Sequence, residues 1–130
     1  MLKRRNIFII LVLFILLGGV TAWNFLFKDI DVKIKNDIQS GKSVVLLFSA
    51  KWCGSCEKQK PIYEKIKNEF PEIHFYLVGS ELNKIKQKLL FKYYNIKGLP
   101  TFVIFKDAKE QTRLIGLQTE EKLREAFLNK

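Results

Sequence analysis

The sequence predicts an α/β fold, a three-layer sandwich around a central mixed sheet, preceded by an N-terminal transmembrane helix. Short apolar runs alternate with segments of helical periodicity, which is typical of a sheet covered by helices. The last two runs are separated by Asp107-Ala108-Lys109, which predicts a hairpin and therefore an antiparallel pair within the sheet. An uncharged run near the N-terminus predicts the membrane helix.

The uncharged run, Asn6–Phe27, would span about 33 Å as a helix, enough to cross a bilayer core of about 30 Å. Residues 3–5 (Lys-Arg-Arg) precede it, so the positive-inside rule places everything after Lys28 outside the cytoplasm. We therefore expect a membrane anchor at 1–28 and a folded domain at 29–130. A cleaved signal peptide ending at Ala22, which would release a secreted protein, is the alternative.

The formal net charge is +10, from 23 Lys and Arg against 13 Asp and Glu. A basic surface can indicate nucleic acid or anionic membrane as a partner. Here the charge is mostly lysine and is scattered along the chain, which favours a compositional bias over a binding stripe for either partner. The chain has two cysteines, too few for a disulfide-stapled scaffold.

The first element of the domain is ambiguous. Ile30, Val32 and Ile34 alternate as in a strand, whereas Ile30, Ile34 and Ile38 have helical spacing. We favour a helix at 31–39, ended by Ser40-Gly41. A strand before this helix would then be short or absent.

The next two elements surround the cysteines. Ser43–Phe48 is a continuous apolar and β-branched run, which predicts a strand buried on both faces. Cys53–Asn68 reads as a helix, kinked at Pro61 and ended before Pro71. Its expected buried face carries Cys56, Tyr63, Ile66 and Phe70.

The second half of the domain repeats this alternation. Ile73–Val78 predicts a strand, and Glu81–Tyr94 a helix, because Leu82, Ile85, Leu89 and Tyr93 recur at helical spacing. Two further strands, Thr101–Phe105 and Gln111–Ile115, flank the hairpin turn.

The last predicted helix begins after Thr119 and runs to about Leu128. Thr119 is the expected N-cap, with two glutamates in the first turn. Leu123 and Phe127 would be its buried residues.

The two cysteines, Cys53 and Cys56, lie where a strand gives way to a helix. The first sulfur would then sit at the helix N-terminus, where free N–H groups and the helix dipole favour a thiolate. The second would face it from one turn inside, as thiol–disulfide exchange requires. Zinc would need more ligands, with His74 the single histidine, and haem attachment would need His where Glu57 stands. We therefore expect a redox-active disulfide with no metal and no cofactor.

From about Gly41 to the C-terminus the chain resembles the thioredoxin family. The resemblance rests on Trp52-Cys53 with Cys56, on Pro61 eight residues after Cys53, on Gly98-Leu99-Pro100-Thr101, and on Gly116 with its following amphipathic helix. Within the family, Gly98–Thr101 followed by an aromatic strand looks most like the C-terminal thioredoxin-like domain of the electron transporter DsbD.

The resemblance implies a role for each site residue. Cys53 would be the nucleophile and Cys56 the thiol that resolves the mixed disulfide. The Leu99–Pro100 bond would be cis, leaving the Leu99 backbone free to pair with an extended substrate. Trp52 would offer an apolar substrate contact. Gly54 and Ser55 would let the loop close.

The sequence departs from the family pattern at two positions. Leu47 stands where thioredoxins usually place a buried Asp, six residues before the first cysteine. The base for Cys56 is therefore left open between water, Glu57 and a lysine. Ser55 replaces the family's proline between the cysteines, which should change the relative stability of the oxidised and reduced forms.

These expectations combine into a membrane-anchored extracytoplasmic enzyme, a thiol:disulfide oxidoreductase that reduces protein disulfides. Its partners would be protein substrates and a transmembrane electron donor of DsbD or CcdA type, with no nucleic acid. A disulfide oxidase or isomerase, a non-catalytic binding module and a peroxidase are the alternatives.

Overall fold

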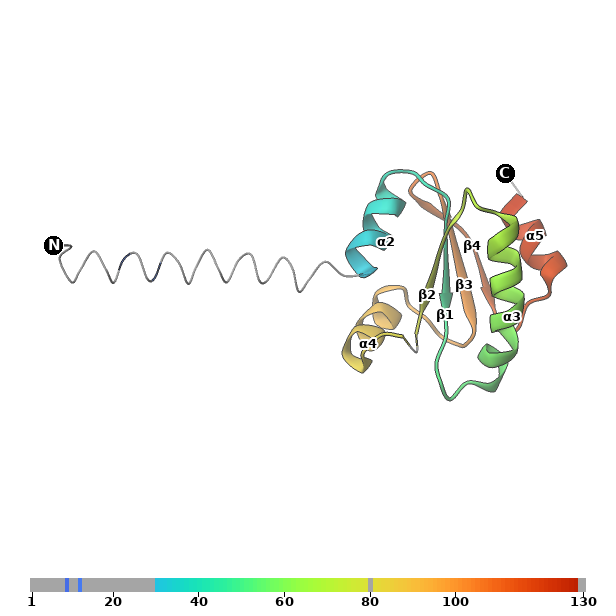
Figure 1. Ribbon diagram of the computed structural model, residues 1–130, viewed down its shortest axis with the longest axis horizontal. Coiled ribbons are helices and arrows are strands. Elements are labelled where there is room, and N and C mark those ends of the chain that lie inside the picture. Colours follow the sequence, from blue (N-terminus) through green and yellow to red (C-terminus); the bar gives the residue numbers. More distant parts are fainter. Residues whose placement is uncertain (1–8, 10–11, 13–29, 80, 129–130) are drawn as a thin grey trace. The chain divides into compact units, whose positions relative to one another are not determined.

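The computed structural model describes residues 9, 12, 30–79 and 81–128 and shows a mixed sheet with the strand order β2-β1-β3-β4 (Figure 1). β1 (Val44–Phe48) is parallel to β2 (His74–Val78) and antiparallel to β3 (Thr101–Lys106), which pairs antiparallel with β4 (Lys109–Ile115). No strand precedes β1 within residues 30–43.

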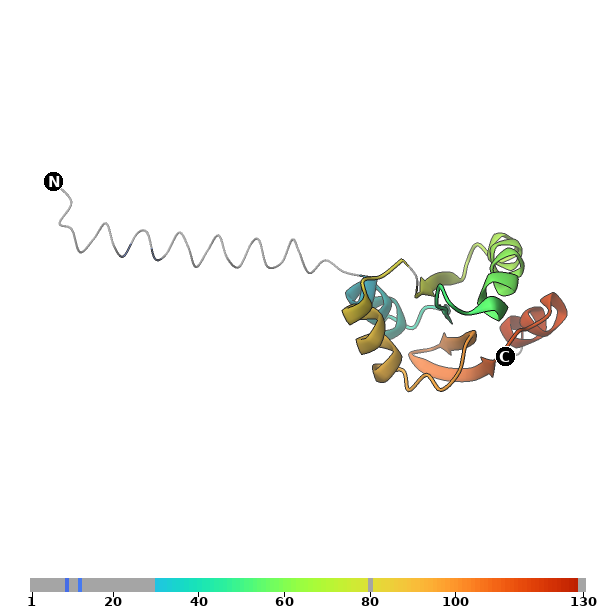
Figure 2. The same ribbon diagram turned by 90° about the horizontal axis from the view of Figure 1, so that it is seen from below.

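Helices cover both faces of this sheet. They are α2 (Ile30–Gln39), α3 (Gly54–Glu69), α4 (Lys84–Tyr93) and α5 (Glu120–Leu128). α4 lies on one face with α2 from Ile34 onward, and α3 and α5 lie on the other (Figures 1 and 2). The predicted three-layer sandwich with a mixed sheet is confirmed.

Backbone contacts divide the chain into two units, residues 1–33 and 34–130. Of the first unit, the structure describes Ile9, Val12 and the first residues of α2. Apart from Ile9 and Val12, the predicted membrane helix at 6–27 lies outside the described residues. Among the residues that are described, no helix is both long and apolar enough to cross a membrane.

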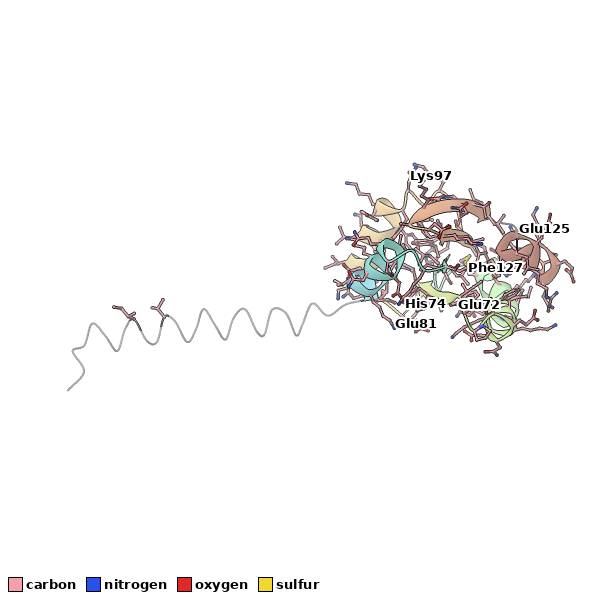
Figure 3. The ribbon with its side chains drawn as sticks, turned by 90° about the horizontal axis from the view of Figure 1, so that it is seen from above. Glu72, His74, Glu81, Lys97, Glu125 and Phe127 are labelled. Atoms are coloured by element: carbon pink, nitrogen blue, oxygen red, sulfur yellow. A yellow bond between two sulfur atoms is a disulfide. The ribbon has the colours of Figure 1, made fainter. Side chains whose placement is uncertain are left out.

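β1 forms the centre of the core. Each of its side chains is at most 1% exposed, which confirms burial on both faces of the strand. On the side of α3 and α5, its residues join a single apolar cluster with Tyr63, Ile66, Phe102, Ile104 and Leu123. Phe127, labelled in Figure 3, packs against this cluster from α5, as the sequence predicts. The strand that carries the cysteine loop is therefore fixed from both sides.

The hairpin between β3 and β4 turns at Asp107 and Ala108, whereas Lys109, the third residue of the predicted turn, already belongs to β4. Asp107 and Ala108 adopt positive φ angles of 53° and 61°, the backbone required at both positions of a tight two-residue connection. β4 consequently begins at Lys109, two residues before the predicted start, and its pairing with β3 shifts register between Ile104 and Phe105.

α4 differs most from its prediction. It begins three residues later than expected because the Asn83 side chain caps it, accepting a hydrogen bond from the Lys86 N–H at 2.9 Å. Leu90 and Tyr94 are buried, and the Tyr94 ring lies 5.4 Å from that of Phe48. The apolar row that predicts the helix, Ile85, Leu89 and Tyr93, is instead exposed.

A polar cluster occupies the end of the sheet at which β1 and β2 begin. Asp37, at the end of α2, is buried and binds Lys42 Nζ at 2.7 Å and His74 Nδ1 at 2.8 Å, and it accepts a hydrogen bond from the Tyr76 hydroxyl. Figure 3 shows His74 beside α2. The bonds from Lys42 and Tyr76 are the main causes that lower the pKa of Asp37 to about 2.

Candidate active site

Cys53 and Cys56 lie at the opposite end of β1, at the start of α3, and form a disulfide with their Cα atoms 5.2 Å apart. Cys53 is the N-cap residue of α3, and its Sγ accepts a hydrogen bond from the Cys56 N–H at 3.2 Å. Sulfur thus takes the place of the oxygen that usually caps a helix. The predicted position of the first sulfur at a helix N-terminus is confirmed.

The two sulfurs differ in access. Cys53 is 6% exposed and Cys56 is 1% exposed. An incoming thiol or disulfide therefore reaches Cys53 first. The Ser55 hydroxyl lies 3.3 Å from Cys53 Sγ, so it can donate a hydrogen bond to that sulfur. Gly54 is exposed, with open space where a Cβ would be.

The loop 98–101 packs beside the disulfide. The Leu99–Pro100 bond is cis, as the resemblance implies, and Leu99 contacts the buried cluster of Ala50, Cys53 and Cys56. The Thr101 hydroxyl donates to the Gly98 carbonyl at 2.8 Å, which closes the loop. The structure therefore brings Leu99 and the two cysteines together from distant parts of the sequence.

Trp52 lies on the surface beside this cluster. Its side chain is 82% exposed although it directly precedes the buried Cys53. A side chain this exposed contributes little to the core, so packing within the domain does not explain why a tryptophan stands at this position. It is available as an apolar contact for a partner.

Ala50 is a site residue that the sequence reasoning missed. It is 2% exposed, packs against both cysteines, and its carbonyl accepts a hydrogen bond from the Cys53 N–H at 3.2 Å. Its small size between a buried strand and the first cysteine is the signal that could have indicated this role.

No carboxylate takes the position of the usual buried Asp. Leu47 is 1% exposed and belongs to the apolar cluster of the core. The Glu57 carboxylate is about half exposed and paired with Lys60 Nζ at 2.8 Å. Across the described part of the chain, no group of three or more His, Cys, Asp or Glu side chains could hold a metal ion. The chemistry this arrangement supports is that of the two sulfurs.

The comparisons with known proteins agree with this geometry. The family model for thioredoxin matches residues 27–129. The H-type thioredoxin of Fagopyrum esculentum is 31% identical over 105 residues, 80% of each chain. The thioredoxin of Mycoplasma genitalium is 34% identical over 88 residues, covering 68% of this chain and 82% of that one.

Solved structures give the same result. The X-ray structure of Fasciola hepatica thioredoxin superposes with a TM-score of 0.62 at 34% identity, covering 73% of this chain and 86% of that one. With a helix-capping Cys-x-x-Cys disulfide beside a cis-proline loop, this chain belongs to the thioredoxin family of dithiol–disulfide oxidoreductases.

Proposed function

We propose that this chain reduces disulfides in extracytoplasmic proteins, with Cys53 as the nucleophile and Cys56 as the resolving thiol. The observation that carries the proposal is the position of the Cys53–Cys56 pair, in which the accessible sulfur caps α3 and the buried one lies a turn further in. In the reduced form, the Cys56 N–H and the helix N-terminus stabilise a Cys53 thiolate.

The exchange occurs in two steps. The Cys53 thiolate attacks one sulfur of the substrate disulfide, forming a mixed disulfide and releasing the other substrate sulfur as a thiolate that takes a proton from water. The Cys56 thiolate then attacks Cys53 Sγ, which releases the second substrate thiol and forms the Cys53–Cys56 bond. Two electrons pass to the substrate, and the chain ends in the oxidised form seen here.

The surface beside the disulfide suits an unfolded or extended substrate segment. The exposed Trp52 ring offers an apolar contact, and the cis bond before Pro100 presents the Leu99 backbone for pairing. Gly54 and Ser55 bring N–H groups to the loop and leave space for the approaching sulfur.

The electrons that restore the dithiol must come from a donor. Residues 1–28 are proposed as a membrane anchor, supported by the uncharged run that follows Lys3, Arg4 and Arg5, with 29–130 on the extracytoplasmic side. The donor would be a transmembrane carrier of DsbD or CcdA type. This assignment is suggested by the likeness of Gly98–Thr101 to the C-terminal domain of DsbD. Secretion after cleavage at Ala22 is the alternative.

Trapping tests the exchange chemistry. A Cys56→Ala variant should retain its substrates as mixed disulfides on Cys53, because the resolving thiol is missing. The matched Cys53→Ala variant should trap none. Envelope extracts in which neither variant gives adducts would contradict the proposal and favour a non-catalytic binding module.

Redox equilibration tests the direction of electron flow. The reduction potential of a reductase should lie well below that of a strong disulfide oxidant. Equilibration against glutathione under mildly reducing conditions should therefore leave Cys53 and Cys56 largely as a disulfide. A potential near −120 mV, about that of a strong disulfide oxidant, would replace the reductase role with that of an oxidase or isomerase.

A further inference from the structure

The outer surface of α4 carries an exposed apolar row. Ile85, Leu89 and Tyr93 recur every fourth residue and are 74%, 61% and 65% exposed. The helix contacts the sheet through its other side, where Leu90 and Tyr94 are each 7% exposed. Three large apolar side chains aligned on one helix indicate an interaction surface more than scattered surface residues do.

A basic row runs beside the apolar one. Lys84, Lys88 and Lys92 are exposed, and each precedes a member of the apolar row by one residue. The lysine row therefore runs parallel to the apolar row, about 100° around the helix. Residues 84–97 contain five lysines and no acidic residue. From α2, Lys35 Nζ lies 4.9 Å from the centre of the Tyr93 ring, and Lys97 extends away from the domain (Figure 3).

We propose that this surface of α4, defined by Ile85, Leu89 and Tyr93 with Lys84, Lys88 and Lys92, binds an anionic lipid bilayer. The apolar row would enter the boundary between headgroups and acyl chains, and the lysine row would contact lipid phosphates. Lysine is depleted at protein–protein interfaces, whereas basic side chains beside an apolar stripe are typical of helices that lie on membranes. The charge of the patch therefore favours lipid over a protein partner.

The location of α4 keeps the contact compatible with thiol exchange. α4 lies on the opposite face of the sheet from α3, which carries Cys56 (Figures 1 and 2). A bilayer bound at α4 would leave the disulfide and Trp52 open to substrates. A single short amphipathic helix binds membranes weakly, so this contact would act with a second attachment, for which the apolar run 6–27 is available.

Hydrogen exchange of the full chain with vesicles tests the proposal. We expect amides of residues 84–97 to exchange at least about threefold more slowly with vesicles containing phosphatidylglycerol than with vesicles of phosphatidylcholine alone. Residues 111–128 should show no such difference. Because both vesicles can hold the run 6–27, the difference between them reports on the α4 surface. High salt should abolish it.

Two pairs of variants sharpen the test. Ile85→Ser with Leu89→Ser should remove the protection, whereas Leu128→Ser, an apolar side chain of similar exposure on α5, should retain it. Lys88→Gln with Lys92→Gln should weaken it, and Lys122→Gln on α5 should not.

Three outcomes would overturn the inference. The first is equal protection of residues 84–97 on both kinds of vesicle, and the second is no protection on either. The third is protection without lipid that grows with protein concentration, which would indicate that a second copy of the chain binds this surface. Disulfide reduction by the Ile85→Ser/Leu89→Ser variant in solution should match the wild type, so a failure here is distinguishable from a failure of the proposed function.

Discussion

The two ends of β1 handle buried polar groups in opposite ways. Where the strand begins, the carboxylate of Asp37 is buried and receives bonds from Lys42, His74 and Tyr76, which hold it charged. Where the strand ends, Leu47 stands where the family usually has a carboxylate, and the sulfurs pack against Ala50 and Leu99. A buried carboxylate is tolerated where donors surround it, and at the sulfur end an apolar side chain stands where the family usually has one.

This difference bears on how Cys56 loses its proton. With Leu47 packed in the core and Glu57 paired with Lys60, neither position offers a free carboxylate to the buried thiol. Of the candidates the sequence left open, water reaching the site beside Cys53 and a lysine then remain as the base. The two ends can be tested separately, because a change at one should leave the other intact.

The largest expected effect is at the sulfur end. Cys53→Ser should lower the rate of disulfide reduction by about 100-fold or more, because a hydroxyl is not ionised at neutral pH and cannot form the mixed disulfide. Reduction of a peptide disulfide, with the chain recycled by a chemical dithiol, measures this. Unfolding of the variant and of the reduced wild type should occur at similar urea concentrations, which excludes misfolding as the cause.

A carboxylate restored at position 47 should be strongly destabilising. Leu47→Asp removes apolar packing from a site that is 1% exposed and adds an unpaired acid, so we expect a loss of about 3–5 kcal/mol at pH 8. Burial raises the pKa of such a carboxyl above its unfolded value, so the variant should lose stability as pH rises above about 4. Urea unfolding at pH 5 and pH 8 measures this.

Leu47→Asn is the matched control for that substitution. Its side chain has nearly the same shape as Asp but does not titrate, so its destabilisation should not depend on pH. Identical pH profiles for the two variants would show that position 47 hydrates freely, contrary to the 1% exposure of Leu47.

At the other end of the strand, Asp37→Ala should cost about 2 kcal/mol, because the buried Tyr76 hydroxyl and the other two donors lose a shared acceptor. Disulfide reduction should be unchanged. The exposed Glu72→Ala serves as control and should leave stability within about 0.5 kcal/mol. A lower rate of disulfide reduction by folded Asp37→Ala would show that the two ends of β1 are coupled.

The sequence was sufficient where local chemistry dictates structure. The apolar run at 44–48, the turn at Asp107 and the Cys53–Cys56 spacing each require little beyond neighbouring residues, and each prediction is confirmed. The cis bond before Pro100 came from the family resemblance, because most prolines of any sequence are trans.

What the sequence did not reveal depends on distant contacts. Helical spacing shows that Ile85, Leu89 and Tyr93 form a row, but it does not show which side of α4 meets the sheet. The aromatic contacts of Phe48 with Phe91 and Tyr94 determine that side. The cluster around Asp37 likewise joins residues 37 positions apart, which no local pattern records.

The smallest effect concerns the acid limit of stability. The folded pKa of Asp37, about 2, lies below its ordinary value of 3.8, so its contribution is complete above about pH 5 and is lost as pH falls towards 2. We expect about 1 kcal/mol, because Lys42, the main partner, is itself about half exposed and screened by water and salt. Two other carboxyls also have a lowered pKa, Glu69 through its hydrogen bonds from Arg124 and Glu120 through those from Lys65. Asp37→Asn keeps an acceptor of the same shape but does not titrate, so subtracting its unfolding free energies from those of the wild type between pH 2 and 6 isolates Asp37 from these two groups. Parallel profiles for the two proteins would mean that Asp37 titrates alike in the folded and unfolded chain, and that the three donors around it shape the structure without contributing to its acid stability.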